Sequence, residues 1–216
     1  MMRLIIHIGD HNLMPSIYED TLKLYKQIDA HIASHYKSAK QKPAPCTKGC
    51  ASCCSQFFEI SPVEFLVIQN HLKDIDPTLL DIFKENSTVL MSLFKEYHRD
   101  FYEEFFHKDN QFVAQSYYQH PERFKIHLPC VFLSKEGYCQ IYPVRPFVCR
   151  TTGVGFKRRF VWGPICNEIR FGYFVHYWQA DLRPFVPQIE TITSVKLDHV
   201  STRQYPMFYL MSQVII

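Results

Sequence analysis

Eight cysteines are the residues of this chain best suited to chemistry, and they fall into two groups. The stretch "PAPCTKGCASCCSQF", residues 43–57, holds four of them within nine positions, and the other four follow much later in the chain. The first group is Cys46, Cys50, Cys53 and Cys54, and the second is Cys130, Cys139, Cys149 and Cys166. Crowded thiols can form disulfides, supply a catalytic nucleophile or bind a metal, and the rest of the sequence discriminates between these uses.

Disulfides and a lone nucleophile both fit the sequence poorly. A chain of 216 residues can bury a core that needs no cross-links. The N-terminal apolar stretch, residues 4–8, contains His7 and is shorter than a secretory signal requires. We therefore predict a cytoplasmic protein, in which thiols stay reduced. A catalytic cysteine would stand alone beside a partner histidine rather than among seven other cysteines.

Metal binding suits the number and spacing of the thiols. Four thiolates match a closed tetrahedral zinc site or a cubane iron–sulfur cluster, so the cofactor is zinc or iron, including a 4Fe-4S cluster. The adjacent pair Cys53–Cys54 complicates the assignment, because neighbouring side chains diverge. Either these two cysteines serve two centres, or one larger cluster reaches both. The number of centres, and which cysteines share one, therefore stays open.

The first group also has the C-x3-C-x2-C spacing of radical S-adenosylmethionine enzymes. Those enzymes have a barrel of repeated strand–helix units and a glycine-rich cofactor segment. This chain shows no internal repeat and only seven glycines. We therefore disfavour this interpretation.

Two motifs together resemble a known family. "CTKGCASCC" is followed far downstream by "CVFLSKEGYCQIYPVRPFVCR", and this combination is similar to the YkgJ-type cysteine-cluster proteins, a zinc- or iron-chelating domain family. The motif positions beyond the cysteines are Ile141, Tyr142, Arg145, Pro146 and Arg150, whereas Cys166 has no clear counterpart. The resemblance implies metal chelation without supplying a substrate. Flagellin lysine methylases carry a similar cluster, so the resemblance also allows an enzyme.

Arg145 and Arg150 flank Cys149 and are candidates for contact with the centre. A four-thiolate zinc or cubane centre carries about two net negative charges, and guanidinium groups can hydrogen-bond its sulfurs. The alternative is that both cap a helix turn or pair with surface carboxylates. The formal charge of +3 treats thiols as neutral, and eight thiolates with two zinc ions would bring it to about −1. The apparent basicity, including "FKRRF" at 156–160, therefore does not predict nucleic-acid binding.

Helices separated by short turns should position these groups. Ser16 with Glu19 predicts a helix over 17–38, Ser61-Pro62 a helix over 62–72, and Asp76-Pro77 the start of a longer helical segment extending towards residue 118. A turn at 135–137 between two short strands, the second at 138–142, predicts a β-hairpin. A strand over 154–162 and a helix over 167–179 are further expectations. The sequence contains no run of about 18 apolar residues, the length that a membrane span needs, so we predict no membrane-spanning segment.

The predicted fold is mainly α with a small β-hairpin (α+β), in one domain over 1–216. It comprises an N-terminal helical segment, 1–40, and a metal-binding core, 43–166. The chain is predicted to be a metal-binding cysteine-cluster protein; the alternative is a metal-cluster-dependent enzyme that modifies protein side chains, methylase-like. The histidines His98, His107, His120 and His127 form no H-x3-H or H-E-x-x-H pair, and are expected to be surface or satisfied residues.

Overall fold

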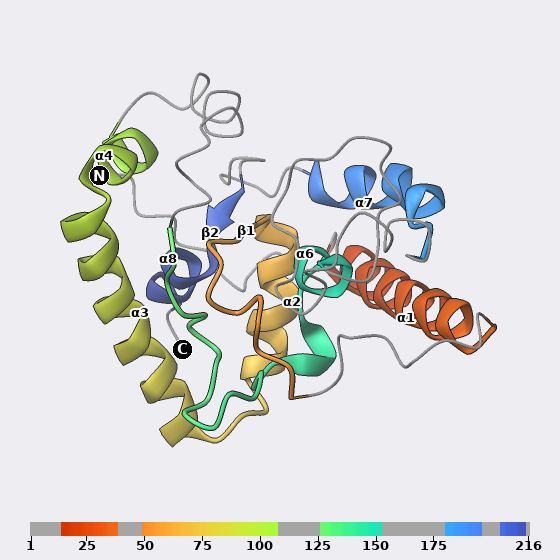
Figure 1. Ribbon diagram of the computed structural model, residues 1–216, viewed down its shortest axis with the longest axis horizontal. Helices are drawn as coiled ribbons and strands as arrows, with labels where there is room; N and C mark the ends of the chain where they lie inside the picture. The colour runs from red at the N-terminus through yellow and green to blue at the C-terminus, as the bar shows by residue number, and fades with distance from the viewer. Residues whose placement is uncertain (1–13, 39–48, 108–125, 153–179, 196–203, 215–216) are drawn as a thin grey trace.

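The computed structural model describes residues 14–38, 49–107, 126–152, 180–195 and 204–214. Helices dominate this part of the chain, and a two-stranded antiparallel sheet accompanies them (Figure 1). The predicted fold class is therefore confirmed. The buried apolar side chains of all five ranges form one hydrophobic core. The boundaries of the predicted segments, 1–40 and 43–166, stay predictions.

Helix α2 (Pro62–Leu72) begins where its local sequence requires. Ser61 is the N-cap: its hydroxyl accepts a hydrogen bond from the Glu64 backbone, and the Glu64 carboxylate accepts one from the Ser61 backbone. Pro62 occupies the first turn, where its missing N–H costs nothing. Helix α2 contacts α1, α7 and α8, and its apolar side chains are buried. It is therefore a central element of the fold (Figure 1).

Helix α1 (Met14–Ser38) lies against α2 and buries one side through residues at helical spacing. Leu24, Tyr25, Ile28 and Ile32 are all less than a tenth exposed. The described helix already includes Met14, so the predicted start at residue 17, with a Ser16–Glu19 capping box, is wrong. A Ser-x-x-Glu pattern fits the first turns of a helix as well as its cap, and here Ser16 lies inside the helix.

Helices α3 (Pro77–Tyr97) and α8 (Met207–Ser212) pack against each other. The N-cap of α3 is Asp76, whose carboxylate accepts a 2.7 Å hydrogen bond from the Thr78 backbone. The buried Ser87 hydroxyl donates a 2.7 Å hydrogen bond to the carbonyl of Phe208 in α8. The predicted continuation of this helical segment is interrupted. Helix α3 ends at Tyr97, its C-cap His98 has φ −132° and ψ 46°, and α4 (Arg99–His107) starts anew. Residues 108–125 lie outside the described residues.

The two-stranded sheet joins segments far apart in the sequence. Strand β1 (Glu59–Ile60) pairs with β2 (Tyr205–Pro206), with Ile60 opposite Tyr205. The predicted hairpin exists as one isolated bridge between Leu133 and Cys139, not as regular strands. The expected second strand, 138–142, gives way to a 3₁₀ turn, η2 (Tyr142–Val144), whose central proline lacks the N–H that a strand ladder needs.

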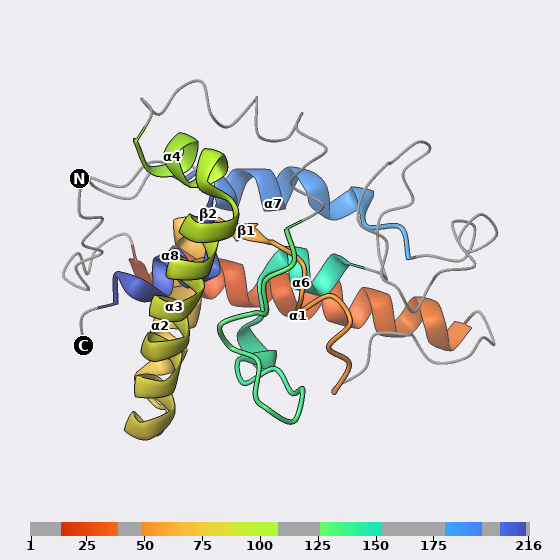
Figure 2. The same cartoon turned by 60° about the vertical axis from the view of Figure 1, so that its left-hand side comes forward.

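Three shorter elements complete the described chain. Helix α6 (Phe147–Thr151) follows η2, and a 3₁₀ turn η5 (Arg183–Phe185) leads into α7 (Val186–Thr193). Both α6 and α7 contact α1 (Figure 2). The strand expected over 154–162 and the helix expected over 167–179 lie outside the described residues. No helix within the described ranges is long and apolar enough to cross a membrane.

Candidate metal centre

Six of the eight cysteines lie within the described residues, and all six are free and half-buried. Cys50, Cys53 and Cys54 lie in the loop 49–56, Cys130 and Cys139 in the loop 126–141, and Cys149 in α6. Cys46 and Cys166 lie outside the described residues. The thiols of both predicted groups are therefore partly shielded from solvent without being cross-linked to each other.

Hydrogen bonds between backbones bring the two groups together. The Cys130 N–H donates a 2.6 Å hydrogen bond to the carbonyl of Cys54. Two residues after Cys54, Gln56 forms an antiparallel bridge with His127. Figures 1 and 2 both show the orange loop 49–56 running alongside the green loop 126–141. Segments that are about 75 residues apart in the sequence thus become neighbours at their cysteines.

Each loop is shaped by tight turns. In the first, Cys54 N–H donates to the Ala51 carbonyl at 2.9 Å and Gln56 N–H to the Cys53 carbonyl at 3.0 Å. In the second, Gly137 has φ +83°, a left-handed conformation that glycine adopts most easily. Gly49, with φ +99°, faces the ring of Tyr138 so closely that a methyl group there would lie 3.1 Å from Cε1. The turns therefore fix how the loops meet.

Helix α6 presents Cys149 and is held by a residue of α2. The buried Glu64 carboxylate accepts a 2.9 Å hydrogen bond from the Phe147 N–H, the first residue of α6, besides its two bonds from Ser61. Burial raises the pKa of Glu64, although these hydrogen bonds oppose the increase. Glu64 thus satisfies the N-termini of two helices at once. The sequence identified its capping box but gave no sign of the second contact.

The thiols of Cys53, Cys130, Cys139 and Cys149 are near enough to affect one another's charge. Burial raises the pKa of Cys130 to about 12, and burial also raises the pKa of Cys139 and Cys149. The pKa of Cys53 is raised mainly by its contact with the Cys54 side chain and then by burial. Negative charge on Cys53 would raise the pKa of the other three further. These thiols are therefore neutral unless a cation replaces their protons.

The donor set fits zinc or iron, although the ligands are not pre-arranged. Within the described ranges, no three Cys, His, Asp or Glu side chains stand ready to coordinate one ion. Neutral thiols have no mutual attraction that would make them converge. Soft sulfur ligands nevertheless suit zinc and iron–sulfur clusters, and a half-buried site suits a charge-compensated centre. A bound metal would supply the cross-link between the two loops.

Arg145 and Arg150 both act electrostatically on Cys139 and share one carboxylate, that of Asp29. Nη2 of Arg145 is 3.3 Å from Oδ1 of Asp29, and Nη1 of Arg150 pairs with Oδ2 of the same residue. Arg150 also lies over the buried ring of Tyr25, 4.2 Å from its centroid. Sequence reasoning missed both Asp29 and Tyr25, because nothing in α1 marks them as partners of a segment more than a hundred residues away.

Among the described side chains, neither His98 nor His127 forms a metal-ligating group with the cysteines. His127 is exposed and takes part in the bridge with Gln56. His98 is the C-cap of α3, its ring lies 5.9 Å from that of Phe94, and burial lowers its pKa. The side chain of His107 and the whole of His120 lie outside the described residues. The expectation that these histidines are surface or satisfied residues thus agrees with His98 and His127, the two whose side chains are described.

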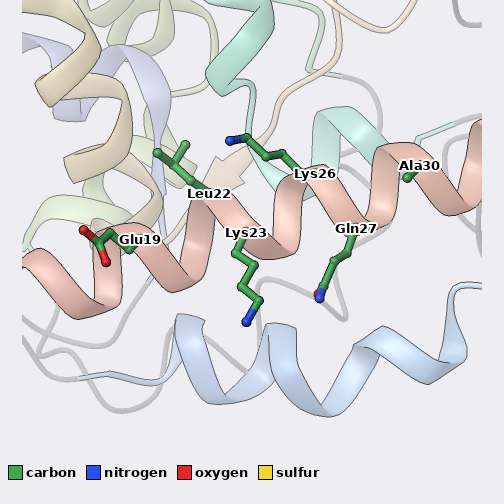
Figure 3. Close-up of a pocket in the computed structure, with 6 residues that line it drawn as sticks. All are labelled: Glu19, Leu22, Lys23, Lys26, Gln27 and Ala30. Carbon is green, nitrogen blue, oxygen red and sulfur yellow. The ribbon is translucent and has the colours of Figure 1, made fainter.

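An open hollow of about 470 Å³ lies along α1. Its described lining comes from that single helix. Figure 3 shows Lys23 and Gln27 extending towards the blue ribbon of α7, whereas Lys26 extends in the opposite direction. The remaining lining residues are Glu19, Leu22 and Ala30. Polar groups that do not converge make this hollow a poor ligand site.

The comparison with known families agrees with the geometry. Residues 45–167, more than half of the chain, match the family CxxCxxCC, described as a "Putative zinc- or iron-chelating domain". The match contains all eight cysteines. The family's name spells its first spacing with two intervening residues, whereas Cys46 and Cys50 are separated by three. No curated protein and no solved structure matches the chain. The chain belongs to the CxxCxxCC family of zinc- or iron-chelating domains, which supports metal binding as its general property.

Proposed function

We propose that the chain binds zinc or iron, including a 4Fe-4S cluster, at thiolates drawn from both cysteine groups. The candidate ligands are Cys46, Cys50, Cys53, Cys54, Cys130, Cys139, Cys149 and Cys166, with Arg145 and Arg150 beside them. The observation that carries the proposal is the direct hydrogen bond from Cys130 to Cys54, which makes the two groups neighbours. A centre built across both groups would tie the two loops together, and an iron centre could in addition carry an electron.

The mutual effects of the thiols support a shared site. Cys53, from the first group, acts electrostatically on Cys130, Cys139 and Cys149, from the second. Ionising several of these thiols together is unfavourable without a cation, so their deprotonation and metal binding should be coupled. The adjacent Cys53 and Cys54 side chains are in contact, and a cluster with several metal ions could use both.

Metal analysis of protein purified without oxygen tests the proposal. We expect about two zinc ions per chain, or about four irons with labile sulfide. Cys53→Ser and Cys139→Ser remove one thiol from each group, and Ser55→Ala is a matched control in the same exposed turn. In a shared site, each cysteine variant loses most of the metal and the double variant loses little more.

Two outcomes would contradict the proposal. If each single variant loses half of the metal and the double variant all of it, the two groups form independent sites. If the wild-type protein is fully folded with eight titratable thiols and no metal, the chain is not a chelator.

A colourless zinc protein and a brown iron–sulfur protein are distinguished by absorption near 400 nm.

A further inference from the structure

The two arginines that flank Cys149 differ in how completely they are hydrogen-bonded. Arg150 is 1% exposed, and each of its three guanidinium nitrogens has a protein partner. Nε donates to the Arg145 carbonyl at 2.8 Å, Nη2 donates to the Pro143 carbonyl at 2.6 Å, and Nη1 pairs with Asp29. Three of its five N–H groups are thus engaged, one on each nitrogen, and the side chain is almost completely enclosed by protein. Arg150 therefore fastens α6 and η2 to α1.

Two of the three guanidinium nitrogens of Arg145 have no partner among the described residues. Its side chain is 13% exposed and stacks over the ring of Tyr142 at 3.9 Å, and Nη2 makes the long contact with Asp29. Its Nε and Nη1 are buried and have no hydrogen-bond partner among the described residues. Buried polar atoms are nearly always hydrogen-bonded in native proteins, and a charged donor without an acceptor is especially unfavourable. The spare donors call for an acceptor.

The candidate acceptors are thiols from both cysteine groups, on which Arg145 acts electrostatically. The positive charge of Arg145 favours the ionised forms of Cys53 and Cys139, against the contact with Cys54 and the burial that favour the neutral forms. A neutral thiol accepts hydrogen bonds only weakly, whereas a metal-bound thiolate is anionic and accepts them well. The two thiols come from different loops, so one guanidinium can serve both sides of a shared centre.

We propose that Arg145 donates hydrogen bonds through Nε and Nη1 to the metal-bound sulfurs of Cys53 and Cys139, and that Arg150 only holds Arg145 in place. This inference rests on the proposed function. Arg145 would offset the negative charge of a thiolate-rich centre and withdraw electron density from its sulfurs. The consequence is tighter metal binding and weaker electron donation from sulfur to metal.

The inference makes different predictions for the two states of the protein. Without metal, Arg145→Gln relieves two unpaired buried nitrogens but also loses the long contact with Asp29 and the stacking on Tyr142, so thermal stability should change little. With metal, the same change removes hydrogen bonds to the centre, so affinity should fall. Arg150→Gln, in contrast, leaves Asp29 and two carbonyls without their partner and should lower stability in both states.

Titration of the metal-free protein with Co²⁺ provides the test, because the sulfur-to-cobalt charge-transfer band reports electron donation by the thiolates. We expect Arg145→Gln to weaken Co²⁺ binding at least about tenfold and to move the band to longer wavelength. Arg145→Lys, which keeps the charge without the forked donors, should restore part of both. Arg183→Gln, at an exposed arginine paired with Asp181, should match the wild type.

The inference is wrong if Arg145→Gln binds Co²⁺ with the wild-type affinity and spectrum. It is also wrong if the variant destabilises the metal-free protein as much as Arg150→Gln does, because both arginines would then be structural. Either result leaves the proposed function intact when the wild-type protein binds metal. A wild-type chain that binds no metal overturns both.

Discussion

Helices α3 and α8 pack through aromatic rings, whereas the cysteine segments, residues 49–56 and 126–152, meet through turns and single hydrogen bonds. Phe94 of α3 is fully buried and its ring lies 5.2 Å from that of Phe57 and 5.6 Å from that of Phe208. In the cysteine segments the regular structure is limited to η2, α6 and isolated bridges. The two regions therefore differ in how much regular structure they contain, although residues 126–152 also bury apolar side chains such as Phe132.

The scarcity of regular structure in the cysteine segments gives a bound metal a structural role there, as proposed above. Apolar burial is independent of any ligand and contributes throughout a helix–helix contact. A loop held by a few hydrogen bonds gains little net free energy from each, because water offers the same bonds to the unfolded chain. A metal that bridges the two loops would supply the missing constraint. Removal of that metal should therefore divide the molecule along this boundary.

The largest expected effect is that of metal removal. Structural zinc releases about 10–16 kcal/mol on binding to small peptides, which is comparable to the stability of a whole domain. After chelation, limited proteolysis should cut both cysteine segments together, while α3 and α8 stay protected. Mass spectrometry of the fragments gives the sites. Sensitivity of only one segment would mean that the two groups hold separate metals.

A cavity in the aromatic region should have the opposite effect. Phe94→Ala removes a fully buried ring and should lower the free energy of unfolding by about 3–5 kcal/mol. Metal content per folded chain should stay at the wild-type level, because the rings of Phe57 and Phe208, on which Phe94 packs, lie outside the cysteine segments. Urea denaturation and metal analysis measure the two quantities. Tyr97→Ala, at a 67% exposed position of the same helix, is the control and should change stability by less than about 0.5 kcal/mol. Loss of metal in Phe94→Ala would show that the regions are coupled.

The sequence predicted those features whose causes are local. The starts of α2 and α3 follow from Ser61-Pro62 and Asp76-Pro77, because a cap and the turn it serves lie within four residues of each other. The break at His98 carries neither glycine nor proline, so no local signal separated α3 from α4. The short strand expected at 138–142 was wrong because a 3₁₀ turn, with Pro143 at its centre, begins at Tyr142 instead.

Residue types also indicated metal binding, but not which atoms meet. Hydrogen bonds between Cys130 and Cys54, or between Phe147 and Glu64, join positions about 80 residues apart in the sequence. No periodicity or spacing encodes such partners, because they depend on how the helices pack. For the same reason the sequence treated Arg145 and Arg150 alike. Their difference lies in the positions of Asp29 and two carbonyl oxygens, which only the folded chain brings together.

Glu64 joins α2, which contacts α8, to the helix that carries Cys149, and its loss should have an intermediate effect. Glu64→Ala leaves the Ser61 and Phe147 N–H groups without their acceptor and should cost about 2–4 kcal/mol of stability. Because Phe147 begins the helix that carries Cys149, metal affinity should fall as well. Thermal denaturation and Co²⁺ titration of the same preparation measure both effects.

Two further variants test this explanation. Glu64→Gln keeps one acceptor oxygen but turns an amide N–H₂ group towards the other donor, so it should lie between the wild type and Glu64→Ala. Glu85→Ala, at an exposed position of α3, should have no effect on either quantity. If Glu64→Ala lowers stability but leaves Co²⁺ affinity unchanged, α6 does not need its cap to present Cys149.

The smallest expected effect is at the turn where the two loops touch. Gly49→Ala forces a left-handed conformation on alanine at a cost of about 1–2 kcal/mol. It also places a methyl group 3.1 Å from the Tyr138 ring, but this ring is 54% exposed and can move aside. Gly137→Ala suffers the same backbone strain with its nearest neighbour, Ala51, at 4.0 Å. The two variants should therefore be destabilised by similar amounts, as measured by urea denaturation of the metal-free protein. A much larger loss at Gly49, relieved in the double variant Gly49→Ala/Tyr138→Ala, would show instead that the ring is fixed and that the loop contact is rigid before any metal binds.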